Sequence, residues 1–165
     1  MTIDLINLKD ATNKDILLEL QPIIDDNLLQ NGGTIGQANE LSDDYDWTHL
    51  FLAKEEGRII GFAILRRSYE DDHGTGFRNY YYISDVILYR AYHGKGYGTA
   101  LLKKVLDCIC DLPVVASVKY NNNASLKMCE KLMTSYDFNG FYYRFMDNNH
   151  YEMKANRSSN SFGRK

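Results

Sequence analysis

The sequence has little cysteine, and its few thiols form no recognisable disulfide or metal-ligand pattern. Cys108, Cys110 and Cys129 are odd in number and include no Cys-x-x-Cys pair. Together with four scattered histidines they show no spacing typical of a metal site, so we expect no metal cofactor. This usage favours a reducing compartment in which thiols are small core residues, and we expect a cytoplasmic protein.

Long hydrophobic runs and a strong excess of charge are also missing. No apolar run approaches the ~20 residues needed to span a bilayer, and the N-terminus shows no signal-peptide pattern. The formal net charge is −3 and the pI is near 5.8, which does not favour a nucleic-acid partner. With 44% apolar and 25% charged residues, the 165-residue chain is typical of one globular domain that needs no membrane.

Hydrophobic spacing predicts a mixed α/β domain over residues 1–147, with the element order β-α-α-β-β-β-α-β-α-β-β. Strands are expected over 2–8, 49–53, 59–67, 80–88, 114–120, 136–138 and 141–146, and helices over 13–29, 97–110 and 124–133, with a shorter helix within 34–47. Pro22 predicts a kink or break in the first helix. Glu55-Glu56-Gly57-Arg58 predicts a hairpin turn, and Asn139-Gly140 predicts a two-residue one. Asn121-Asn122-Asn123 predicts a turn whose side chains cap the helix that follows. The polar tail, residues 148–165, is expected to be disordered from about residue 153.

The most distinctive stretch is a glycine-rich turn between a predicted strand and a predicted helix. It reads His93-Gly94-Lys95-Gly96-Tyr97-Gly98 and continues as Thr99-Ala100-Leu101-Leu102. Alternate glycines let the backbone adopt positive φ and approach a ligand, and the first N–H groups of a helix have no partner within it. The spacing fits neither a Walker loop nor Gly-x-Gly-x-x-Gly. The stretch therefore predicts another kind of phosphate-binding turn, to which Lys95 adds a positive charge.

This turn resembles the acyl-CoA loop of the GCN5-related N-acetyltransferase (GNAT) superfamily, Gln/Arg-x-x-Gly-x-Gly/Ala between a strand and a helix. The one departure is His93, whose ring can still offer an N–H. The resemblance covers about residues 2–147 and implies a GNAT-like fold in which an acetyl group moves from acetyl-CoA to a primary amine of a small molecule or peptide by direct attack. It implies cofactor contacts from one group of residues, with Leu88 acting through its backbone N–H: Ile87, Leu88, His93, Gly94, Lys95, Gly96, Tyr97, Gly98, Thr99, Asn122 and Ser125.

The family's proton-transfer residues are matched less closely. Its glutamate on the long strand aligns with Ser84, and the neighbouring Asp85 is a candidate base that reaches the substrate only if a bulge re-aims it. A second signature, Asn122-Asn123-Ala124-Ser125 through Glu130-Lys131, puts Cys129 where the family often has a tyrosine acid. Cys129 either packs near the cofactor or acts as an acid or an acylated thiol. Tyr120 and Tyr136 are candidates to replace the missing hydroxyl.

Two other functions remain open at this point. The chain could be a non-catalytic acyl-CoA-binding module, in which Ser84 and Cys129 record lost chemistry. It could also be a toxin that acetylates aminoacyl-tRNA, although the acidic balance argues against RNA binding. The final hairpin offers an edge through which a homodimer could form.

Overall fold

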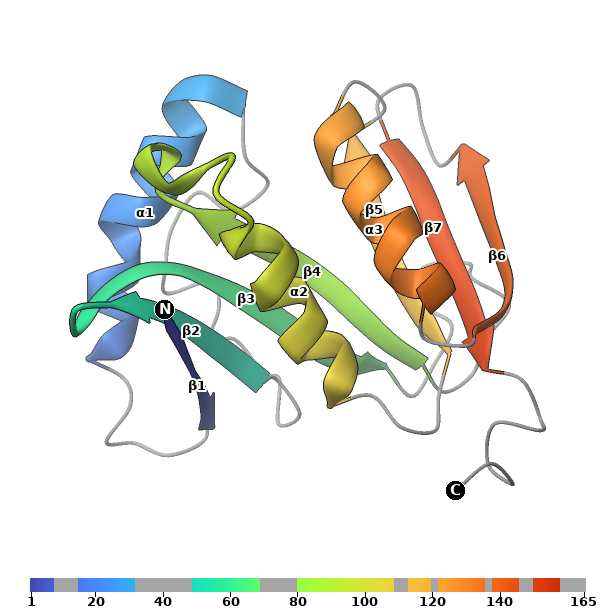
Figure 1. The fold of residues 1–165 in the computed structure, drawn as a ribbon, viewed down its shortest axis with the longest axis horizontal. Helices are drawn as coiled ribbons and strands as arrows, with labels where there is room; N and C mark the ends of the chain where they lie inside the picture. Colours follow the sequence, from blue (N-terminus) through green and yellow to red (C-terminus); the bar gives the residue numbers. More distant parts are fainter. Residues whose placement is uncertain are drawn as a thin grey trace. The chain divides into compact units, whose positions relative to one another are not determined.

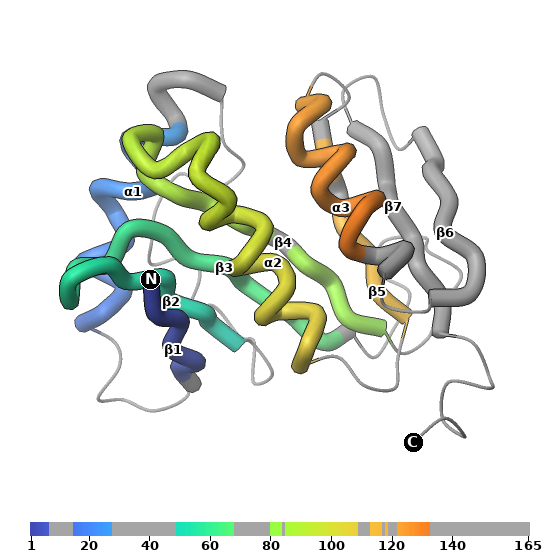
Figure 2. Tube along the Cα trace, viewed as in Figure 1, coloured from blue at the N-terminus to red at the C-terminus, as the bar shows by residue number. Residues whose placement is uncertain are grey.

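The computed structural model describes residues 1–7, 15–31, 49–68, 80–108, 113–119, 122–135, 138–145 and 150–157, and the short helix expected within 34–47 lies outside them. The chain divides into two compact units, residues 1–66 with 85–104 and residues 67–84 with 105–165. Figure 1 labels the elements of both units, and Figure 2 traces their backbone. Strand β4 (Tyr80–Leu88) and helix α2 (Tyr97–Asp107) contribute residues to both units.

The strands of the first unit follow the order β1 (Thr2–Asn7), β2 (His49–Glu55), β3 (Arg58–Ser68) and the last residues of β4. β1 pairs with β2, and β2 with β3, in antiparallel fashion. Glu56 and Gly57 close the β2–β3 hairpin with φ values of 50° and 78°. A two-residue turn with both φ positive matches the twist of its strands, and it confirms the hairpin predicted at this place.

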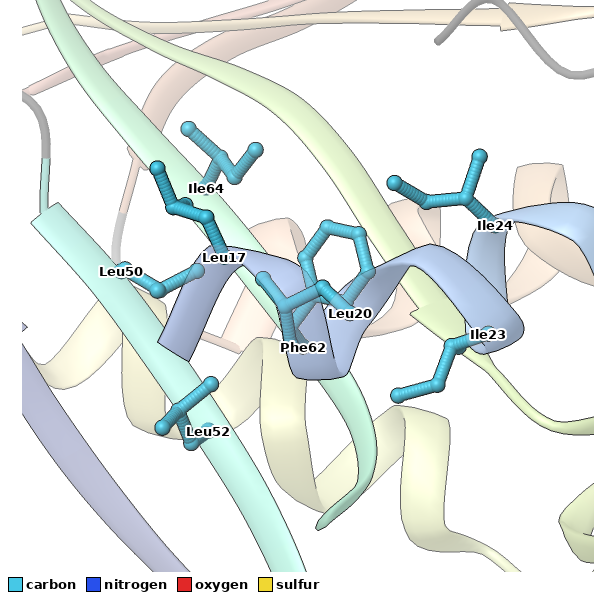
Figure 3. Close-up of a cluster of buried hydrophobic side chains, with 8 residues drawn as sticks. All are labelled: Leu17, Leu20, Ile23, Ile24, Leu50, Leu52, Phe62 and Ile64. Atoms are coloured by element: carbon cyan, nitrogen blue, oxygen red, sulfur yellow. The ribbon is translucent and has the colours of Figure 1, made fainter. Parts of the chain in front are cut away.

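Helix α1 (Ile16–Asn31) runs through Pro22 as one helix rather than two. Its apolar side chains form a buried cluster with side chains of β2 and β3, as Figure 3 shows: Leu17, Leu20, Ile23, Ile24, Leu50, Leu52, Phe62 and Ile64. Proline removes one helical hydrogen bond, at a cost of ~3 kcal/mol. Burying a single leucine or isoleucine contributes about 1.5–3 kcal/mol, so the cluster outweighs the proline.

Both faces of β2 and β3 are buried in the first unit. Residues 50–53 of β2 alternate between the two faces, and all four are fully buried. Helix α1 covers one face, while the first part of α2, with buried Leu101 and Leu102, lies on the other (Figures 1 and 3). This double cover explains why residues 50–53 and 59–65 contain no charged side chain.

The strands of the second unit follow the order β4, β5 (Val114–Lys119), β7 (His150–Arg157) and β6 (Phe138–Phe145). β4 pairs with β5 in parallel, while β5 with β7 and β6 with β7 are antiparallel, so the sheet is mixed. Helix α3 (Asn123–Ser135) follows β5 and buries Cys129 and Leu132, three residues apart on one face. The mixed α/β class expected from the sequence is confirmed.

Two expectations for the end of the chain differ from the structure. Asn139-Gly140 lies inside β6, at a register shift against β7, and the hairpin instead connects Phe145 to His150. A bulge needs the same permissive backbone as a tight turn, so the dipeptide fits both. Residues 153–157, expected to be disordered because they are polar, lie in β7, where backbone pairing with β5 and β6 does not depend on apolar side chains. The single domain expected over residues 1–147 stays a prediction.

Candidate functional site

The segment that leads into the glycine-rich turn is hydrogen-bonded to the sheet of the first unit. Just after β4, the Tyr89 N–H donates to the Ile60 carbonyl of β3 at 2.9 Å. A short 3-10 helix, η3 (Arg90–Tyr92), follows, and the His93 N–H closes it by donating to the Arg90 carbonyl at 3.0 Å. The backbone therefore leaves the sheet in a defined direction before the glycines begin.

Two of the glycines adopt a backbone conformation that other residues avoid. The φ angles of Gly94 and Gly96 are 74° and 82°, a region that costs an L-residue roughly 1–2 kcal/mol. No heavy atom of the described residues outside the adjoining chain lies within 4 Å of the place where a Cβ would stand on either glycine. Glycine is needed here for conformation rather than for packing, and the space above the turn is open to a ligand.

The turn leads into a helix whose first amides have no partner in that helix. The first hydrogen bond of α2 runs from the Ala100 N–H to the Gly96 carbonyl, at 3.1 Å. The N–H groups of Tyr97, Gly98 and Thr99 precede it and are left for a ligand or solvent. These amides, the positive end of the helix dipole and the exposed Lys95 together form a site suited to an anion.

Aromatic and charged side chains connect the turn to the end of β2. The Lys95 Nζ lies 5.3 Å from the ring centroid of Tyr92, and that ring stacks on Tyr97 at 6.0 Å. The Tyr97 hydroxyl donates a hydrogen bond to the Glu55 carboxylate. That hydrogen bond, followed by desolvation, raises the pKa of Tyr97, so the hydroxyl is a protonated donor at neutral pH.

The carbonyl oxygen of Leu88, the last residue of β4, accepts two side-chain hydrogen bonds. Asn27 Nδ2 of α1 donates to it at 2.9 Å, and His93 Nε2 lies 3.0 Å away. Because a carbonyl only accepts, the proton of a neutral His93 ring must be on Nε2. The ring N–H that was expected to contact the cofactor is therefore used within the protein, which leaves Nδ1 and the backbone of His93 for a ligand.

The backbone N–H of Leu88 points away from β3. A Cβ on Gly61 would stand 2.6 Å from the Ile87 carbonyl oxygen and 2.3 Å from Leu88 Cδ2, so this oxygen faces β3 and only glycine fits at position 61. In a trans peptide the next N–H, that of Leu88, points in the opposite direction. This orientation is compatible with the contact that the resemblance implies for the Leu88 N–H.

Asp26, next to Asn27 on α1, holds the first residue of η3. Its Oδ2 accepts a hydrogen bond from the Arg90 N–H at 2.8 Å, and its Oδ1 lies 3.6 Å from Arg90 Nε. Burial, and then the negative charge of Asp26, raise the pKa of the neighbouring Tyr89. Asp26, Asn27 and Glu55 were not predicted as site residues, because partners 64, 61 and 42 positions away leave no local pattern.

The candidate bases lie on β4. Asp85 and Ile87 are partly buried and share one face of the strand, since they are two residues apart. Ile87 packs against the α1 cluster, which puts Asp85 on the α1 face as well. Ser84 is part of the same continuous strand.

The candidate residues around α3 belong to the second unit. Asn122 Oδ1 accepts a hydrogen bond from the Ser125 N–H at 3.2 Å, which confirms the predicted helix cap. Cys129 is only 6% exposed, and burial raises the pKa of its thiol to about 11. A neutral, buried thiol favours the packing interpretation of Cys129. Tyr120 and Tyr136 lie outside the described residues.

Neither a metal centre nor a membrane span is found in the part of the chain that the structure describes. Within it, no three His, Cys, Asp or Glu side chains are grouped as metal ligands would be. None of its helices combines the length and the apolar character needed to cross a bilayer.

Several solved structures share this fold at low sequence identity. Acetyl-CoA-bound yncA from Salmonella typhimurium matches with a TM-score of 0.66 at 19% identity, covering 96% of this chain and 94% of its own. The NatC complex bound to a Gag peptide and CoA matches with a TM-score of 0.64 at 16% identity, covering 96% of this chain and 100% of its own. NAA60 from Arabidopsis thaliana, in complex with a bisubstrate analogue, matches with a TM-score of 0.61 at 15% identity, covering 93% of this chain and 98% of its own. At these identities the likeness shows the fold.

The sequence itself was compared with curated proteins and with protein families. No curated protein is significantly similar to it. The sequence model of the acetyltransferase (GNAT) family matches residues 21–133, which is more than half of the chain and includes the glycine-rich turn, the end of β4 and most of α3. The chain belongs to the acetyltransferase (GNAT) family.

Proposed function

We propose that this protein is an acyl-CoA-dependent N-acetyltransferase that moves an acetyl group from acetyl-CoA to a primary amine. The observation that carries the proposal is the open turn. Gly94 and Gly96 have positive φ and open space above them, and they lead into the first amides of α2, which have no partner within that helix. In a member of this family, such a turn is suited to the pyrophosphate of acyl-CoA.

The residues present fit this cosubstrate. Backbone amides from Gly94 to Thr99 and the Lys95 ammonium would hold the pyrophosphate, while Ile87, the Leu88 N–H, His93, Asn122 and Ser125 are proposed to hold the rest of the molecule. Bound acetyl-CoA supplies an activated acyl group that an amine can accept. The Leu88 N–H is proposed to stabilise charge on the acyl oxygen, a type of contact that contributes about 2.7–4 kcal/mol in the transition state.

We propose that side chains of β4 help to remove a proton from the amine. An aliphatic amine has a pKa near 10.4, so recruiting its neutral form at pH 7 costs on the order of 4 kcal/mol. Asp85 is the candidate base, directly or through water, and Ser84 is a candidate to hold that water. Because Cys129 is buried with a pKa of about 11, we propose that it packs and does not act as the acid. A leaving thiolate with a pKa of ~8.5 can depart without an acid at neutral pH, and Tyr136 stays the second candidate for that role.

Peptide α-amines are the acceptor class to test first. NatC is bound to a Gag peptide and NAA60 to a bisubstrate analogue, and this chain shares their fold. Small amines, such as polyamines and aminoglycosides, form the second set. Both classes present a primary amine that must lose a proton before it reacts. A peptide α-amine has an ordinary pKa of about 7.7–8.0, so recruiting its neutral form costs less free energy than for an aliphatic amine.

One observation favours a second candidate, an acyl-CoA-binding module without catalysis. Cys129, at the position where the family often has a tyrosine acid, is buried and holds its proton up to about pH 11. Such a module would bind acetyl-CoA and respond to it thermally in the same way as an enzyme. Turnover with an amine separates the two.

The experiment combines thermal unfolding with thiol release. Acetyl-CoA at 100 times its Kd is expected to stabilise the protein by about 2.7 kcal/mol, and an amine from the panel should then release free CoA. Asp85→Asn is expected to lower the rate, by the 10²–10⁴-fold typical of a lost general base, while acetyl-CoA binding persists. Thermal stabilisation without thiol release from any amine would favour the binding module, and no stabilisation would contradict both.

A further inference from the structure

Two adjacent side chains of helix α1 make hydrogen bonds to the backbone at the end of β4. Asn27 donates to the Leu88 carbonyl at 2.9 Å, and Asp26 accepts from the Arg90 N–H at 2.8 Å. Both residues are partly buried. Together they hold the backbone on either side of Tyr89, where the strand ends and the turn begins.

The Asn27 side-chain nitrogen makes two hydrogen bonds. Its Nδ2 donates to the Ile23 carbonyl within α1 at 3.0 Å as well as to Leu88. An amide nitrogen has two hydrogens, and each carbonyl needs a donor, so the orientation of the side chain is fixed by chemistry. Asn27 therefore ties the backbone of α1 to the backbone of β4 without freedom to rotate.

The Leu88–Tyr89 peptide group is held on both sides. On one side the Tyr89 N–H donates to Ile60 of β3, and on the other the Leu88 carbonyl accepts from Asn27 and His93. Two donors match the two lone pairs of a carbonyl oxygen. Because the carbonyl and the N–H of a strand residue leave the same edge, fixing the carbonyl of Leu88 also fixes its N–H.

We propose that Asn27 and Asp26 are positioning residues for the acyl-CoA site. Asn27 orients the Leu88 N–H through the Leu88 carbonyl, and Asp26 fixes the start of the turn through the Arg90 N–H. Preorganised donors cost no reorganisation when a ligand binds, so this double contact from α1 favours both cosubstrate binding and contact with the acyl oxygen. The role in binding rests on the function proposed above, whereas the ordering of the backbone does not.

The first test needs no ligand. Amide hydrogen exchange over residues 88–100 is measured for the wild type and for Asp26→Ala, Asp26→Asn and Asn27→Ala. Each alanine variant loses a hydrogen bond at the end of β4, and we expect exchange in this segment to become about tenfold faster. Asp26→Asn keeps an oxygen that can accept from the Arg90 N–H, so exchange should return to within about threefold of the wild type.

Two control variants on α1 separate positioning from general effects. Asp25→Ala removes the same charge from the neighbouring position, where the side chain accepts a hydrogen bond from Gln21 instead. Ile24→Val weakens the buried cluster without touching the backbone of β4 or the turn. Exchange over 88–100 should stay at the wild-type rate in both controls. Equal exchange in Asp26→Ala and Asp25→Ala, or in Asn27→Ala and Ile24→Val, would overturn the proposal.

The second test measures CoA binding by calorimetry. Asp26→Ala and Asn27→Ala should weaken CoA by about five- to tenfold relative to Asp25→Ala and Ile24→Val. If the wild type does not bind CoA, the proposed function is wrong, and the exchange measurement still decides the positioning role. If the wild type binds and the variants bind equally well, the positioning role in binding is wrong. Should Asn27→Ala fail to fold, the comparison of Asp26→Ala with Asp25→Ala tests the positioning role by itself.

Discussion

The starts of α2 and α3 have the same local context but differ in how their first amides are satisfied. Each helix follows a strand through a short connection. At α3, the Asn122 side chain accepts a hydrogen bond from the Ser125 N–H, and the Asn122 carbonyl accepts the first helical bond. At α2, Gly96 has the same place in the helix and also accepts the first helical bond, but it has no side chain.

This difference separates a helix start that its own side chain stabilises from one whose amides are left open for a ligand. A side-chain cap typically contributes ~1 kcal/mol to the free energy of unfolding. An uncapped start gives up that contribution and leaves its amides and dipole available to an anion. Loss of the cap of α3 should therefore lower the free energy of unfolding even without CoA, whereas substitutions at the start of α2 should chiefly change the affinity for CoA.

The largest change in the free energy of unfolding is expected from Cys129, on the buried face of α3. An unfolded thiol ionises near pH 8.5, whereas burial raises the pKa of Cys129 to about 11. Between these values the unfolded state binds fewer protons, so the free energy of unfolding should fall as pH rises, by about 3 kcal/mol in total. Below about pH 8.5 this contribution is present in full.

Denaturant unfolding from pH 8 to 11 measures how the free energy of unfolding falls as the pH rises. Cys129→Ala should remove that part of the pH dependence, whatever its effect on stability at pH 8. Cys108→Ala, at an exposed thiol, is the matched control and should keep the wild-type slope. Identical slopes in all three proteins would show that Cys129 ionises as readily in the folded state as in the unfolded state.

The open helix start is tested by adding one methyl group. Gly96→Ala and Gly57→Ala both put a side chain at positive φ with open space around it, so each should lower the free energy of unfolding by about 1–2 kcal/mol. Only Gly96→Ala puts that methyl group over the amides of α2, and we expect it to weaken CoA by about tenfold or more. If calorimetry gives the two variants the same Kd, the turn is not the pyrophosphate site.

The capped helix start is tested by removing its side chain. Asn122→Ala should lower the free energy of unfolding by ~1 kcal/mol, whereas Asn122→Gly should cost only a few tenths. Urea unfolding at neutral pH distinguishes the two. A larger loss for glycine than for alanine would mean that the backbone conformation at 122, rather than the cap, matters.

The smallest effect is expected from the charge beside the open turn. Lys95→Ala should weaken CoA binding by about 0.3–1 kcal/mol at low ionic strength. Lys104→Ala removes the same charge from an exposed position near the other end of α2 and should change the affinity less. Raising the salt concentration should shrink the difference between the variants, because exposed charges are screened.

Elements with a strong local signal could be predicted well from the sequence. β4 has the predicted bounds, the β2–β3 hairpin closes at Glu56-Gly57, and Asn122 caps α3 as expected. The glycines of the turn also signal their own conformation, because positive φ is a property of a single residue. For the hairpin, the cap and the glycines, the determining interactions lie within a few positions along the chain.

Elements that depend on distant partners could not be predicted in the same way. Pro22 does not divide α1, because burial against β2 and β3 outweighs its local cost. Asn139-Gly140 lies at a register shift within β6 rather than in a turn, since the pairing of β6 with β7 extends past it. His93 donates the ring N–H that was expected to contact the cofactor to the Leu88 carbonyl instead.

The sequence by itself determined the family, the strand, turn and helix around Gly94 and Gly96, and the cap of α3, because periodicity, glycine and capping chemistry act over short ranges. Tertiary structure alone brought Asp26, Asn27 and Glu55 to the turn. Their partners lie 42 to 64 positions away, and such hydrogen bonds depend on how α1 and β2 pack rather than on any local pattern.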